Sequence, residues 1–372
     1  MTDIFPGKLG LVQRVLPVYR APFFETLAQR CAGGLQIFAG EPLPGEGIAP
    51  ARELTRARLT RARNLNFLSP ASPAYLCFQR GLLTWLEEND PAALIVEANP
   101  RYLSTPAALR WMKSRRRPVL GWGLGPPAGP WGFVRNLDGL IAYSARGAAR
   151  YIAGGFPAEK VFIAPNAASP APAFELPVRG AEFSSRRLAA VTGIESLLTA
   201  HEPPRPVLLF VGRIQPRKRL PALLAACAGL PAALRPALLI VGDGPALNDL
   251  KKNAPPWAHF PGALRGAALE ACFRAADLFV LPGTGGLAVQ EAMSFGLPVI
   301  VAQGDGTQDD LVRPANGWQI PPGDDAALAE TLREALSDLP RLRRMGAESY
   351  RIVKEEINLE QMAAKFVQAL AV

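Results

Sequence analysis

The sequence is poor in the side chains that hold metals and build catalytic triads. Its 372 residues include two histidines, His201 and His259, and four cysteines that form no CxxC pair. A histidine-rich metal centre is therefore excluded, and a Ser-His-Asp triad is disfavoured. The isolated cysteines predict reduced thiols in the core of a cytoplasmic protein, not a disulfide framework.

Long uncharged apolar runs are also missing. No apolar segment is long enough to cross a bilayer, so the sequence predicts no membrane-spanning helix. The first ten residues, MTDIFPGKLG, show no basic start followed by an apolar stretch, and we expect no signal peptide. Both absences favour a cytoplasmic location.

Positive charge, in contrast, is plentiful. The formal net charge is +9, which favours anionic partners such as nucleotide phosphates, lipid headgroups or nucleic acid. Basic residues concentrate in two stretches, 52–63 and 110–117. Each is either a solvated surface or a face that meets an anionic membrane, which would make the protein peripheral on the inner membrane face. The arginines are the only feature of the sequence that favours nucleic-acid binding, and we do not expect nucleic acid as a partner.

Strand and helix signals alternate through most of the chain, which predicts parallel sheets covered by helices on both faces. In the first half the expected strands are 9–15, 35–39, 93–96, 119–122, 139–143 and 161–164. The expected helices are 22–30, 73–88, 105–115 and 146–153. The polar segment 42–65 is predicted as a loop with some helix.

Strand signals lapse between residues 166 and 206, where prolines cluster and one short helix is expected near 184–190. A second alternating unit begins at Val207. Its expected strands are 207–211, 237–241, 259–261, 278–281, 298–301 and 317–320. Its expected helices are 220–227, 245–252, 267–275, 286–294, 309–311, 325–337, 340–353 and 358–372. Two doubly wound units in series predict that a ligand binds between them.

The loop after strand 207–211 is the first chemical signal. Gly212 permits a tight turn, and Arg213 and Lys218 follow it. Arginine can grip a phosphate with two donors, and lysine supplies a point charge, so the pair predicts a phosphate site. Two surface cations on a turn are the alternative interpretation.

Three further signals follow along the chain. The turn 242–245, GDGP, follows a strand and lets a ligand approach the backbone. The turn 283–286 precedes a helix and offers amides to an anionic oxygen. Glu291 on that helix is the one charge between residues 278 and 301, and its carboxylate could accept two hydroxyl hydrogen bonds, as from a ribose diol.

Together these segments resemble the carboxyl-terminal domain of the family-four GT-B glycosyltransferases, over about 207–365. The resemblance rests on GRIQPRK at 212–218, GDGP at 242–245, FPG at 260–262, ADLFVLP at 276–282 and GLAVQEAMSFGLPV at 286–299. The first half is more weakly similar to the acceptor domain of that family. There the matching segments are DGLIAYS at 138–144 and VFIAPNA at 161–167.

The resemblance implies a GT-B fold of two Rossmann-like domains facing a central cleft. It implies an acceptor domain at 1–168, a linker region at 169–206, a donor domain at 207–353, and a last helix at 354–372 that crosses back to the first domain. The implied activity is transfer of a sugar from a nucleotide-diphosphate sugar, a UDP- or GDP-sugar, to an acceptor hydroxyl. In this family the reaction usually proceeds with retention and without a metal or other cofactor.

The resemblance also assigns residues. Arg213 and Lys218 would hold the diphosphate and stabilise its charge as the glycosidic bond breaks. Glu291 would bind the ribose hydroxyls. The rest of the expected donor site consists of Gly212, Gly242, Gly262, Leu264, Gly283, Thr284, Gly285, Gly286 and Leu287.

The sequence departs from the family pattern in three places. The family usually has a second glutamate eight positions before Glu291, and Gly283 stands there instead. Its glycine-glycine loop after the first strand is replaced by Pro17–Arg20, and its acceptor-domain histidine has no counterpart in residues 119–125.

Candidate acceptor-side residues follow the strand ends of the first half. They are Tyr19, Arg20, Glu97, Asn99 and Arg101. Glu97 comes directly after an apolar strand, and we expect it to orient or deprotonate the hydroxyl of a sugar, lipid-linked or small-molecule acceptor. A helix cap or a structural hydrogen-bond acceptor is the alternative for Glu97.

Two other functions compete with glycosyl transfer. The glycine at position 283 would suit a catalytically silent GT-B protein that binds a nucleotide or sugar and acts through partners. A nicotinamide-dependent dehydrogenase would need the glycines of 121–125 to open a helix, and Pro126, Pro127 and Pro130 oppose one there. The sequence gives no oligomeric state.

Overall fold

The protein is represented by a computed structural model, which describes residues 4–70, 72–126, 129–176 and 205–371. By its internal contacts the chain divides into unit 1, which is Met1–Pro170 with Asn358–Val372, and unit 2, which is Ala171–Ile357. The short helix expected near 184–190 and most of the expected linker lie outside the described residues.

Unit 1 contains the strands β1 (Leu9–Val15), β2 (Leu35–Gly40), β3 (Arg58–Arg61), β4 (Arg63–Phe67), β5 (Leu76–Arg80), β6 (Ala93–Glu97), β7 (Val119–Gly123), β8 (Gly139–Ala142) and β9 (Val161–Ile163). Its described helices are η1 (Val18–Arg20), α1 (Ala21–Ala28), α2 (Leu82–Asn89), α3 (Thr105–Ser114), η2 (Gly132–Asn136), α4 (Ala145–Ala153), η3 (Ala158–Lys160) and α14 (Leu359–Ala369).

The main sheet of unit 1 is parallel, and its described strands follow the order β3-β2-β1-β6-β7-β8-β9. The chain works outward from β1 in one direction and then returns to β6 on its other side. Between β1 and β6 the order reverses, and such a switch point is where doubly wound sheets bind ligands. The register shifts in the β1–β2 ladder between Gln13 and Val15, so Arg14 is left out of it.

Unit 2 contains the strands β10 (Val207–Val211), β11 (Ala237–Val241), β12 (Ala258–Gly262), β13 (Leu278–Leu281), β14 (Val299–Ala302) and β15 (Gly317–Ile320). Its described helices are η4 (Pro216–Lys218), α7 (Leu220–Ala228), α8 (Leu247–Lys252), α9 (Ala267–Ala275), α10 (Leu287–Ser294), α11 (Thr307–Leu311), α12 (Asp325–Ser337), α13 (Leu339–Arg351) and the π-helix η5 (Ile352–Glu356).

The described strands of unit 2 form a second parallel sheet, ordered β12-β11-β10-β13-β14-β15. Its switch point lies between β10 and β13. The apolar runs of β10, β11, β13 and β14 are almost wholly buried, as expected for strands covered on both faces. Gly296 ends α10 with φ +68°, the left-handed conformation of a C-cap glycine.

One part of unit 1 differs from the prediction. The predicted helix at 73–88 begins only at Leu82, because residues 76–80 form β5 and pair antiparallel with β4. Exposed and buried residues alternate with a period of two along β5, which is a strand pattern. The polar segment 42–65 contains β3 and the start of β4, and its described residues form no helix.

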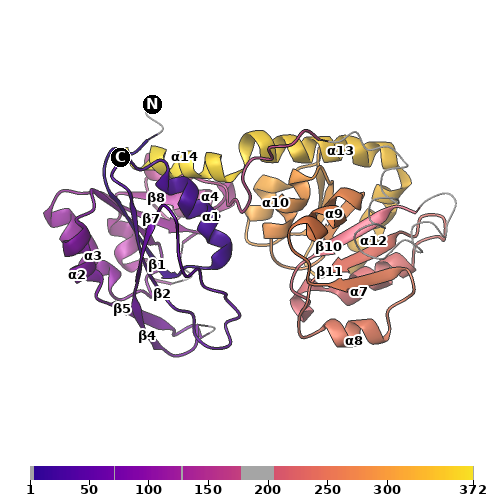
Figure 1. Cartoon of the computed structure of the whole chain (residues 1–372), viewed down its shortest axis with the longest axis horizontal. Coiled ribbons are helices and arrows are strands. Elements are labelled where there is room, and N and C mark those ends of the chain that lie inside the picture. Colours follow the sequence, from indigo (N-terminus) through magenta and orange to yellow (C-terminus); the bar gives the residue numbers. More distant parts are fainter. Residues whose placement is uncertain (1–3, 71, 127–128, 177–204, 372) are drawn as a thin grey trace. The chain divides into compact units, whose positions relative to one another are not determined.

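Helix α14 belongs to unit 1 and packs beside α1 (Figure 1). Phe366 of α14 is fully buried. The centre of its ring lies 4.9 Å from the ring centre of Phe23 and 5.0 Å from that of Trp122. The backbone N–H of Leu359 donates to the carbonyl of Ser169 at 3.1 Å, so the two places where the chain crosses between units are joined within unit 1.

All four cysteines are free and buried, in agreement with the prediction of core thiols. Among the described helices, none combines the length and the apolar character needed to cross a bilayer. Strand β7 ends at Gly123, within the glycine segment 121–125, and residues 124–126 and 129–131 are not helical. The arrangement needed for a dinucleotide fingerprint is therefore missing from the described part of this loop.

Candidate functional site

The switch point of unit 2 gathers most of the expected donor site. The loops after β10, β11, β12 and β13 all leave the carboxyl edge of the sheet, because parallel neighbours end at the same edge. These loops carry Gly212–Lys218, Gly242–Pro245, Gly262–Leu264 and Gly283–Gly286. The structure thus brings residues more than 70 positions apart in sequence into one region.

Backbone hydrogen bonds fix these loops to one another. The N–H of Gly212 donates to the Val241 carbonyl at 3.0 Å, and the N–H of Gly242 donates to the Gly262 carbonyl at 2.8 Å. The N–H of Ile214 donates to the Asp243 carbonyl at 2.8 Å. These hydrogen bonds connect neighbouring loops of the carboxyl edge, and such connections favour the preorganised donors that a binding site needs.

The glycines of this edge are required by close backbone contact. A Cβ added to Gly242 would lie 1.9 Å from the carbonyl oxygen of Gly212, and one added to Gly244 would lie 2.1 Å from that of Ile214. Both glycines also have positive φ, +146° and +159°. The sequence GDGP therefore has a structural cause here, beyond any approach of a ligand.

Lys218 connects the two loops of the switch point, the loop after β10 and the turn after β13. It is 8% exposed, and its ammonium donates to the carbonyl of Thr284 at 2.5 Å. The neighbouring Arg217 donates to the hydroxyl of Thr284 at 3.1 Å, and the Thr284 N–H donates to the Arg217 carbonyl at 3.2 Å. The cationic loop after β10 and the glycine turn after β13 therefore form one connected structure.

Burial lowers the pKa of Lys218 to about 8, and the positive charge of Arg217 acts in the same direction. The lysine therefore remains mostly protonated at pH 7. A desolvated cation next to the glycine turn 283–286 is suited to an anion such as a phosphate, because the anion would neutralise the positive charge of the ammonium.

Gly283 occupies the position of the glutamate that the family usually has. A Cβ there would lie 2.1 Å from the carbonyl oxygen of Arg217 and 2.6 Å from the Cα of Lys218. The backbone of η4 therefore fills the space that a side chain at position 283 would need. A Cβ at Gly285 would lie 2.3 Å from the Lys218 ammonium, so this turn is closely fitted to the lysine.

The remaining expected donor residues lie nearby in sequence and fold, with fewer contacts. Arg213 is exposed on the loop after β10, and Leu264 is half-buried between β12 and α9. Leu287 is the first residue of α10, after Gly286 at its N-cap. Glu291 is partly buried on α10, and burial, followed by the charge of Glu270, raises its carboxyl pKa.

Sequence reasoning missed Gln308, in the first turn of α11. Its Nε2 donates to the carbonyl of Gly285 at 3.1 Å, and within the described chain its buried Oε1 has no hydrogen-bond partner. Gln308 follows β14, the next strand of the same edge. The convergence of loops at that edge is the signal that would have identified it.

The switch point of unit 1 holds Glu97, the last residue of β6. The backbone N–H of Arg14 donates to Oε2 of Glu97 at 2.5 Å. Arg14 can make this bond because the register shift in β1 frees its amide from the ladder. Its guanidinium in turn forms an ion pair with Glu46 at 2.7 Å.

Glu97 also lines a cavity of about 640 Å³ at the carboxyl edge of the unit 1 sheet. Asn99, Arg101, Trp122 and Tyr143 are among the other lining residues. Burial raises the pKa of the Glu97 carboxyl to about 7, although the amide and the guanidinium of Arg14 act in the opposite direction. A carboxyl with such a pKa can accept or release a proton near neutral pH.

The other acceptor-side candidates have different environments. Tyr19 is half exposed, whereas Arg20 is only 8% exposed. The Arg20 guanidinium lies 5.4 Å from the ring centre of Trp122 and 5.6 Å from that of Tyr143, and donates to the Ala167 carbonyl at 3.4 Å. Arg20 therefore supports two walls of the cavity.

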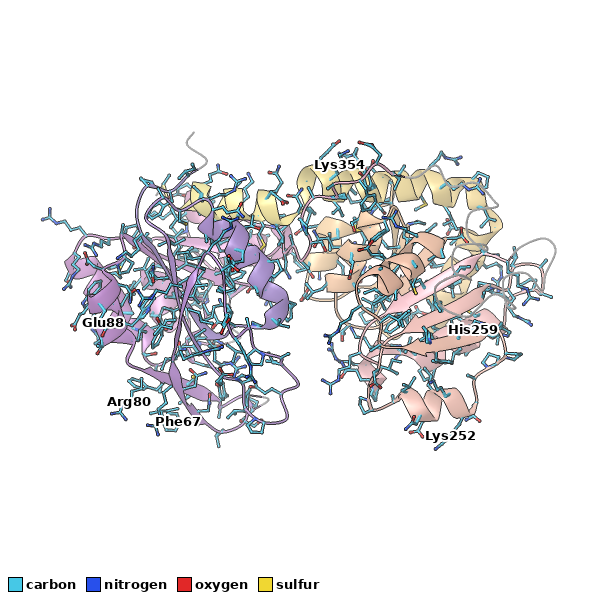
Figure 2. All side chains as sticks on the ribbon, in the orientation of Figure 1. Phe67, Arg80, Glu88, Lys252, His259 and Lys354 are labelled. Carbon is cyan, nitrogen blue, oxygen red and sulfur yellow. The ribbon has the colours of Figure 1, made fainter. Side chains whose placement is uncertain are left out.

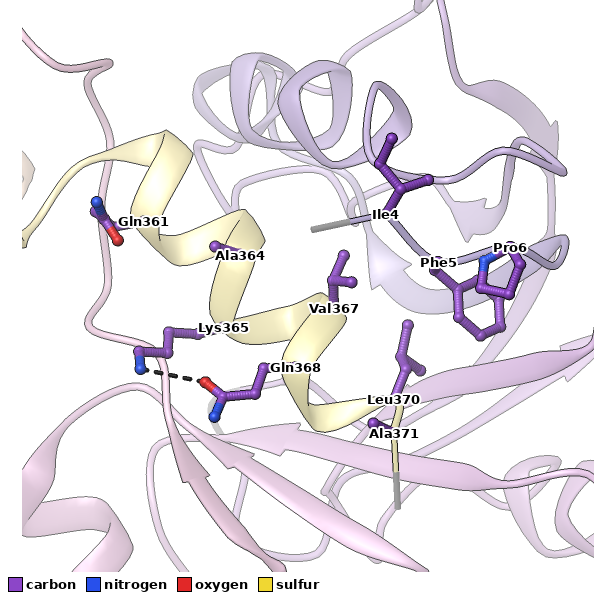
Figure 3. Close-up of a pocket in the computed structure, with 10 residues that line it drawn as sticks. All are labelled: Ile4, Phe5, Pro6, Gln361, Ala364, Lys365, Val367, Gln368, Leu370 and Ala371. Atoms are coloured by element: carbon purple, nitrogen blue, oxygen red, sulfur yellow. Dashed lines mark hydrogen bonds between the residues drawn. The ribbon is translucent and has the colours of Figure 1, made fainter. Parts of the chain in front are cut away.

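A second cavity of unit 1, of about 590 Å³, lies between α14 and the segment Ile4–Pro6 (Figure 3). Its lining is largely apolar. Its charged side chain, Lys365, donates to Oε1 of Gln368 at 3.2 Å. Among the described lining residues no carboxylate or histidine is present, so this cavity lacks the acid–base groups found beside Glu97.

The two parallel sheets, each with one point where the strand order reverses, define the class of fold. Alr3699/HepE of Anabaena, solved in complex with UDP, superposes on 98% of this chain and 99% of its own, with a TM-score of 0.66 and 15% identity. At that identity the likeness shows the fold, and the fold is the GT-B fold, with parallel sheets in two Rossmann-like halves.

Sequence comparison relates part of the chain to a family of enzymes. Residues 198–352 match the family model described as glycosyl transferases group 1. The sulfoquinovosyl transferase SQD2 of Arabidopsis thaliana is 37% identical over 149 residues, 38% of this chain and 28% of that protein. A GDP-mannose-dependent alpha-mannosyltransferase of Mycolicibacterium smegmatis is 44% identical over 115 residues, 30% of this chain and 28% of that protein.

The resemblance predicted from the sequence is thus confirmed for the segment that carries the donor-site motifs. The chain matches less than a third of the length of these two relatives. The matching segment, 198–352, includes every expected donor residue from Gly212 to Glu291.

Proposed function

We propose that this protein is a glycosyltransferase that moves a sugar from a nucleotide-diphosphate sugar to an acceptor hydroxyl, with retention and without a metal ion. The four free, buried thiols are consistent with the cytoplasmic location that we also propose. The observation that carries the proposal is the buried ammonium of Lys218 inside the connected loops after β10 and β13. These loops lie in the segment that matches the group 1 family.

The reaction gives these residues a simple task. The bond between the anomeric carbon of the sugar and the diphosphate oxygen breaks, and its electron pair goes to the diphosphate. The acceptor oxygen bonds to the same carbon and loses its proton. Lys218, the exposed Arg213 and the amides of Gly285 to Leu287 would stabilise the charge gained by the diphosphate. Glu291 would bind the ribose, because its carboxylate makes no hydrogen bond within the described chain.

For the acceptor we propose the cavity beside Glu97. With a pKa near 7, the Glu97 carboxylate can take the proton of an acceptor hydroxyl around neutral pH. As the nucleotide we propose UDP or GDP, because the fold neighbour HepE was solved with UDP and the relative from Mycolicibacterium smegmatis is named as GDP-mannose-dependent.

The test is donor turnover combined with nucleotide binding. We expect the protein to consume at least one UDP- or GDP-sugar, and the reaction to persist in EDTA with retained anomeric configuration by proton NMR. In Lys218→Ala, turnover should fall by about 10²–10³-fold. Affinity for the nucleoside diphosphate should fall more than affinity for the nucleoside, because only the phosphates lose a partner.

Lys252→Ala is the matched control. Lys252 is an exposed lysine of the same unit, paired with Asp249 on α8, and its loss should leave turnover unchanged. Nucleotide binding without consumption of any sugar donor would favour the silent GT-B protein instead. Equal losses of nucleoside and nucleoside diphosphate affinity in Lys218→Ala would contradict the role of Lys218.

A further inference from the structure

The β4–β5 hairpin of unit 1 exposes apolar side chains on one face. Directly paired residues share a face of a sheet, and the register pairs Leu65 with Phe78 and Phe67 with Leu76. The exposed fractions are 37% for Leu65 and Leu76, 39% for Phe78 and 52% for Phe67. Figure 2 shows Phe67 reaching outward at the lower edge of unit 1. Contiguous apolar exposure of this kind marks an interaction site.

The opposite face of the hairpin is polar and fixed in place. Gln79 is 2% exposed, and its Nε2 donates to the carbonyl of Gln13 at 2.9 Å and to Oδ1 of Asn64 at 3.2 Å. Nδ2 of Asn64 donates to the carbonyl of Arg14 at 2.8 Å. Turning the apolar face inward would break these buried hydrogen bonds, so the hairpin is held with its apolar face outward.

Two arginines complete the outer face. Arg63 pairs directly with Arg80, and like charges in that position destabilise an antiparallel pair. Residues 56–80 include five arginines and no acidic residue. Among the described residues Arg61 forms an ion pair with Glu41, whereas Arg63 and Arg80 form none. The arginine pair is therefore suited to an anion from outside the chain.

We propose that this hairpin face docks on a bilayer that contains anionic lipids. The hairpin face consists of Arg63, Leu65, Phe67, Leu68, Leu76, Phe78 and Arg80. Its apolar side chains enter the boundary between headgroups and acyl chains, and its two arginines bind lipid phosphates. A second copy of the chain fits less well, because a symmetric contact would bring four arginines together with no acidic residue in either hairpin.

Docking would place the acceptor cavity at the membrane surface. Pro73, in the loop between β4 and β5, lines the cavity that contains Glu97. The hairpin is also bonded to the backbone of Gln13 and Arg14, next to Glu97. This step rests on the proposed function. If the protein transfers a sugar, the acceptor hydroxyl belongs to a membrane lipid. Vesicle binding requires no turnover, so docking and transfer can fail separately.

The test is sedimentation of the full chain with vesicles of phosphatidylcholine, with and without phosphatidylglycerol. We expect binding that depends on phosphatidylglycerol. Arg63→Gln/Arg80→Gln should weaken it by about fivefold for each arginine at low salt. Phe67→Ser/Phe78→Ser should weaken it by about tenfold or more, and should do so also at high salt, where charge is screened.

Two matched controls come from unit 1. Arg110→Gln/Arg116→Gln removes the same charge from the second basic stretch, and Ile152→Ser removes an apolar side chain that is 41% exposed on α4. Both variants should bind vesicles like the parent protein. Circular dichroism spectra that match the parent would establish that each variant is folded.

A probe at the hairpin tip supplies a second measurement. Leu68 is 62% exposed, and the four native cysteines are buried, so Leu68→Cys introduces the accessible thiol for an environment-sensitive dye. The emission should shift to the blue on phosphatidylglycerol vesicles, and the same dye on Ile152→Cys should not shift.

The proposal is overturned if the parent protein ignores phosphatidylglycerol vesicles, or if the arginine loss in the second basic stretch weakens binding as much as the loss in the hairpin. It is also overturned if sedimentation velocity shows a dimer that Phe67→Ser/Phe78→Ser dissociates, without vesicle binding by the parent. The hairpin face would then be an interface between two copies.

Discussion

At the scale of single residues, the raised pKa of Glu97 leads to a prediction about stability and pH. Its pKa is about 7 in the folded protein and near 4.5 in an unfolded chain. Between these values the folded state binds more protons than the unfolded state. Stability therefore falls as pH rises from about 4.5 to 7, because the charged carboxylate is less favourable in its buried position.

This sign leads to a prediction for Glu97→Gln. The amide cannot ionise, so the variant should lose less stability than the parent between pH 5 and pH 8. The expected difference is roughly 1–3 kcal/mol. Urea unfolding followed by tryptophan fluorescence can measure it, because four of the six tryptophans lie in unit 1. Parallel pH dependences for the two proteins would show that Glu97 is not perturbed.

Gly283 gives a second prediction at this scale. Because backbone atoms of η4 fill the space for a side chain, Gly283→Ala should destabilise unit 2 by about 1–3 kcal/mol. Gly283→Glu, which installs the residue usual in the family, should lower stability and nucleotide affinity instead of improving activity. Thermal unfolding and nucleotide titration test both variants.

Gly229→Ala is the control for this pair. Gly229 lies in the same unit, and a Cβ there would meet its nearest neighbour at an ordinary 3.6 Å. Its replacement should have little effect. A Gly283→Ala protein as stable as Gly229→Ala would mean that η4 moves aside readily, and that position 283 can accept a side chain.

Residue chemistry was predictable where it depended on sequence neighbours. Lys218 and Thr284 were both expected in the donor site, since each follows a strand of the same predicted sheet. Their direct hydrogen bond was not expected, because it depends on how two loops 66 residues apart pack. The bond from Arg14 to Glu97 was hidden for the same reason, since it needs a register shift that no local pattern reveals.

At the scale of elements, α14 contributes a side chain to the aromatic core of unit 1. Phe366 contributes a fully buried ring to the cluster with Phe23 and Trp122. Phe366→Ala should destabilise unit 1 by about 3–5 kcal/mol, because it leaves a cavity in a packed aromatic core. Hydrogen exchange should then show loss of protection in α1 and β7.

The control for α14 is Gln361→Ala, on the exposed side of the same helix. It keeps the helix and leaves the aromatic cluster intact, so protection should be unchanged. Equal effects of the two substitutions would indicate that fraying of the helix, and not loss of the ring, explains the result.

The hairpin of β4 and β5 shows why some elements were mispredicted. Leu76 and Phe78 fall within the helix that was expected over residues 73–88. In the structure they face outward, and Gln79 and Cys77 face inward. A pattern in which burial and polarity are inverted misleads any prediction that assigns apolar residues to the interior. The central strands had no such ambiguity, and their predicted bounds match closely.

At the scale of the whole molecule, two parallel sheets covered by helices were predictable because both halves repeat the alternation of buried strands and helices. The GT-B class was implied by the family resemblance of the second half and not by this alternation. The specific family match was confined to the second half, where the phosphate-site motifs preserve their order. The predicted domain limits remain predictions. The contact division falls within a few residues of the predicted limits at 168 and 353, whereas unit 2 begins at Ala171 and not at the predicted start of the donor domain, residue 207.

The position of α14 along the chain also sets an order of events during synthesis. Every residue of unit 2 leaves the ribosome before Phe366 does, although Phe366 is needed to complete the core of unit 1. The part of the protein that is made first must therefore wait, with an incomplete core around Phe23 and Trp122, until the part made later has emerged. Nascent unit 1 is thus the segment on which chaperones would be expected to act.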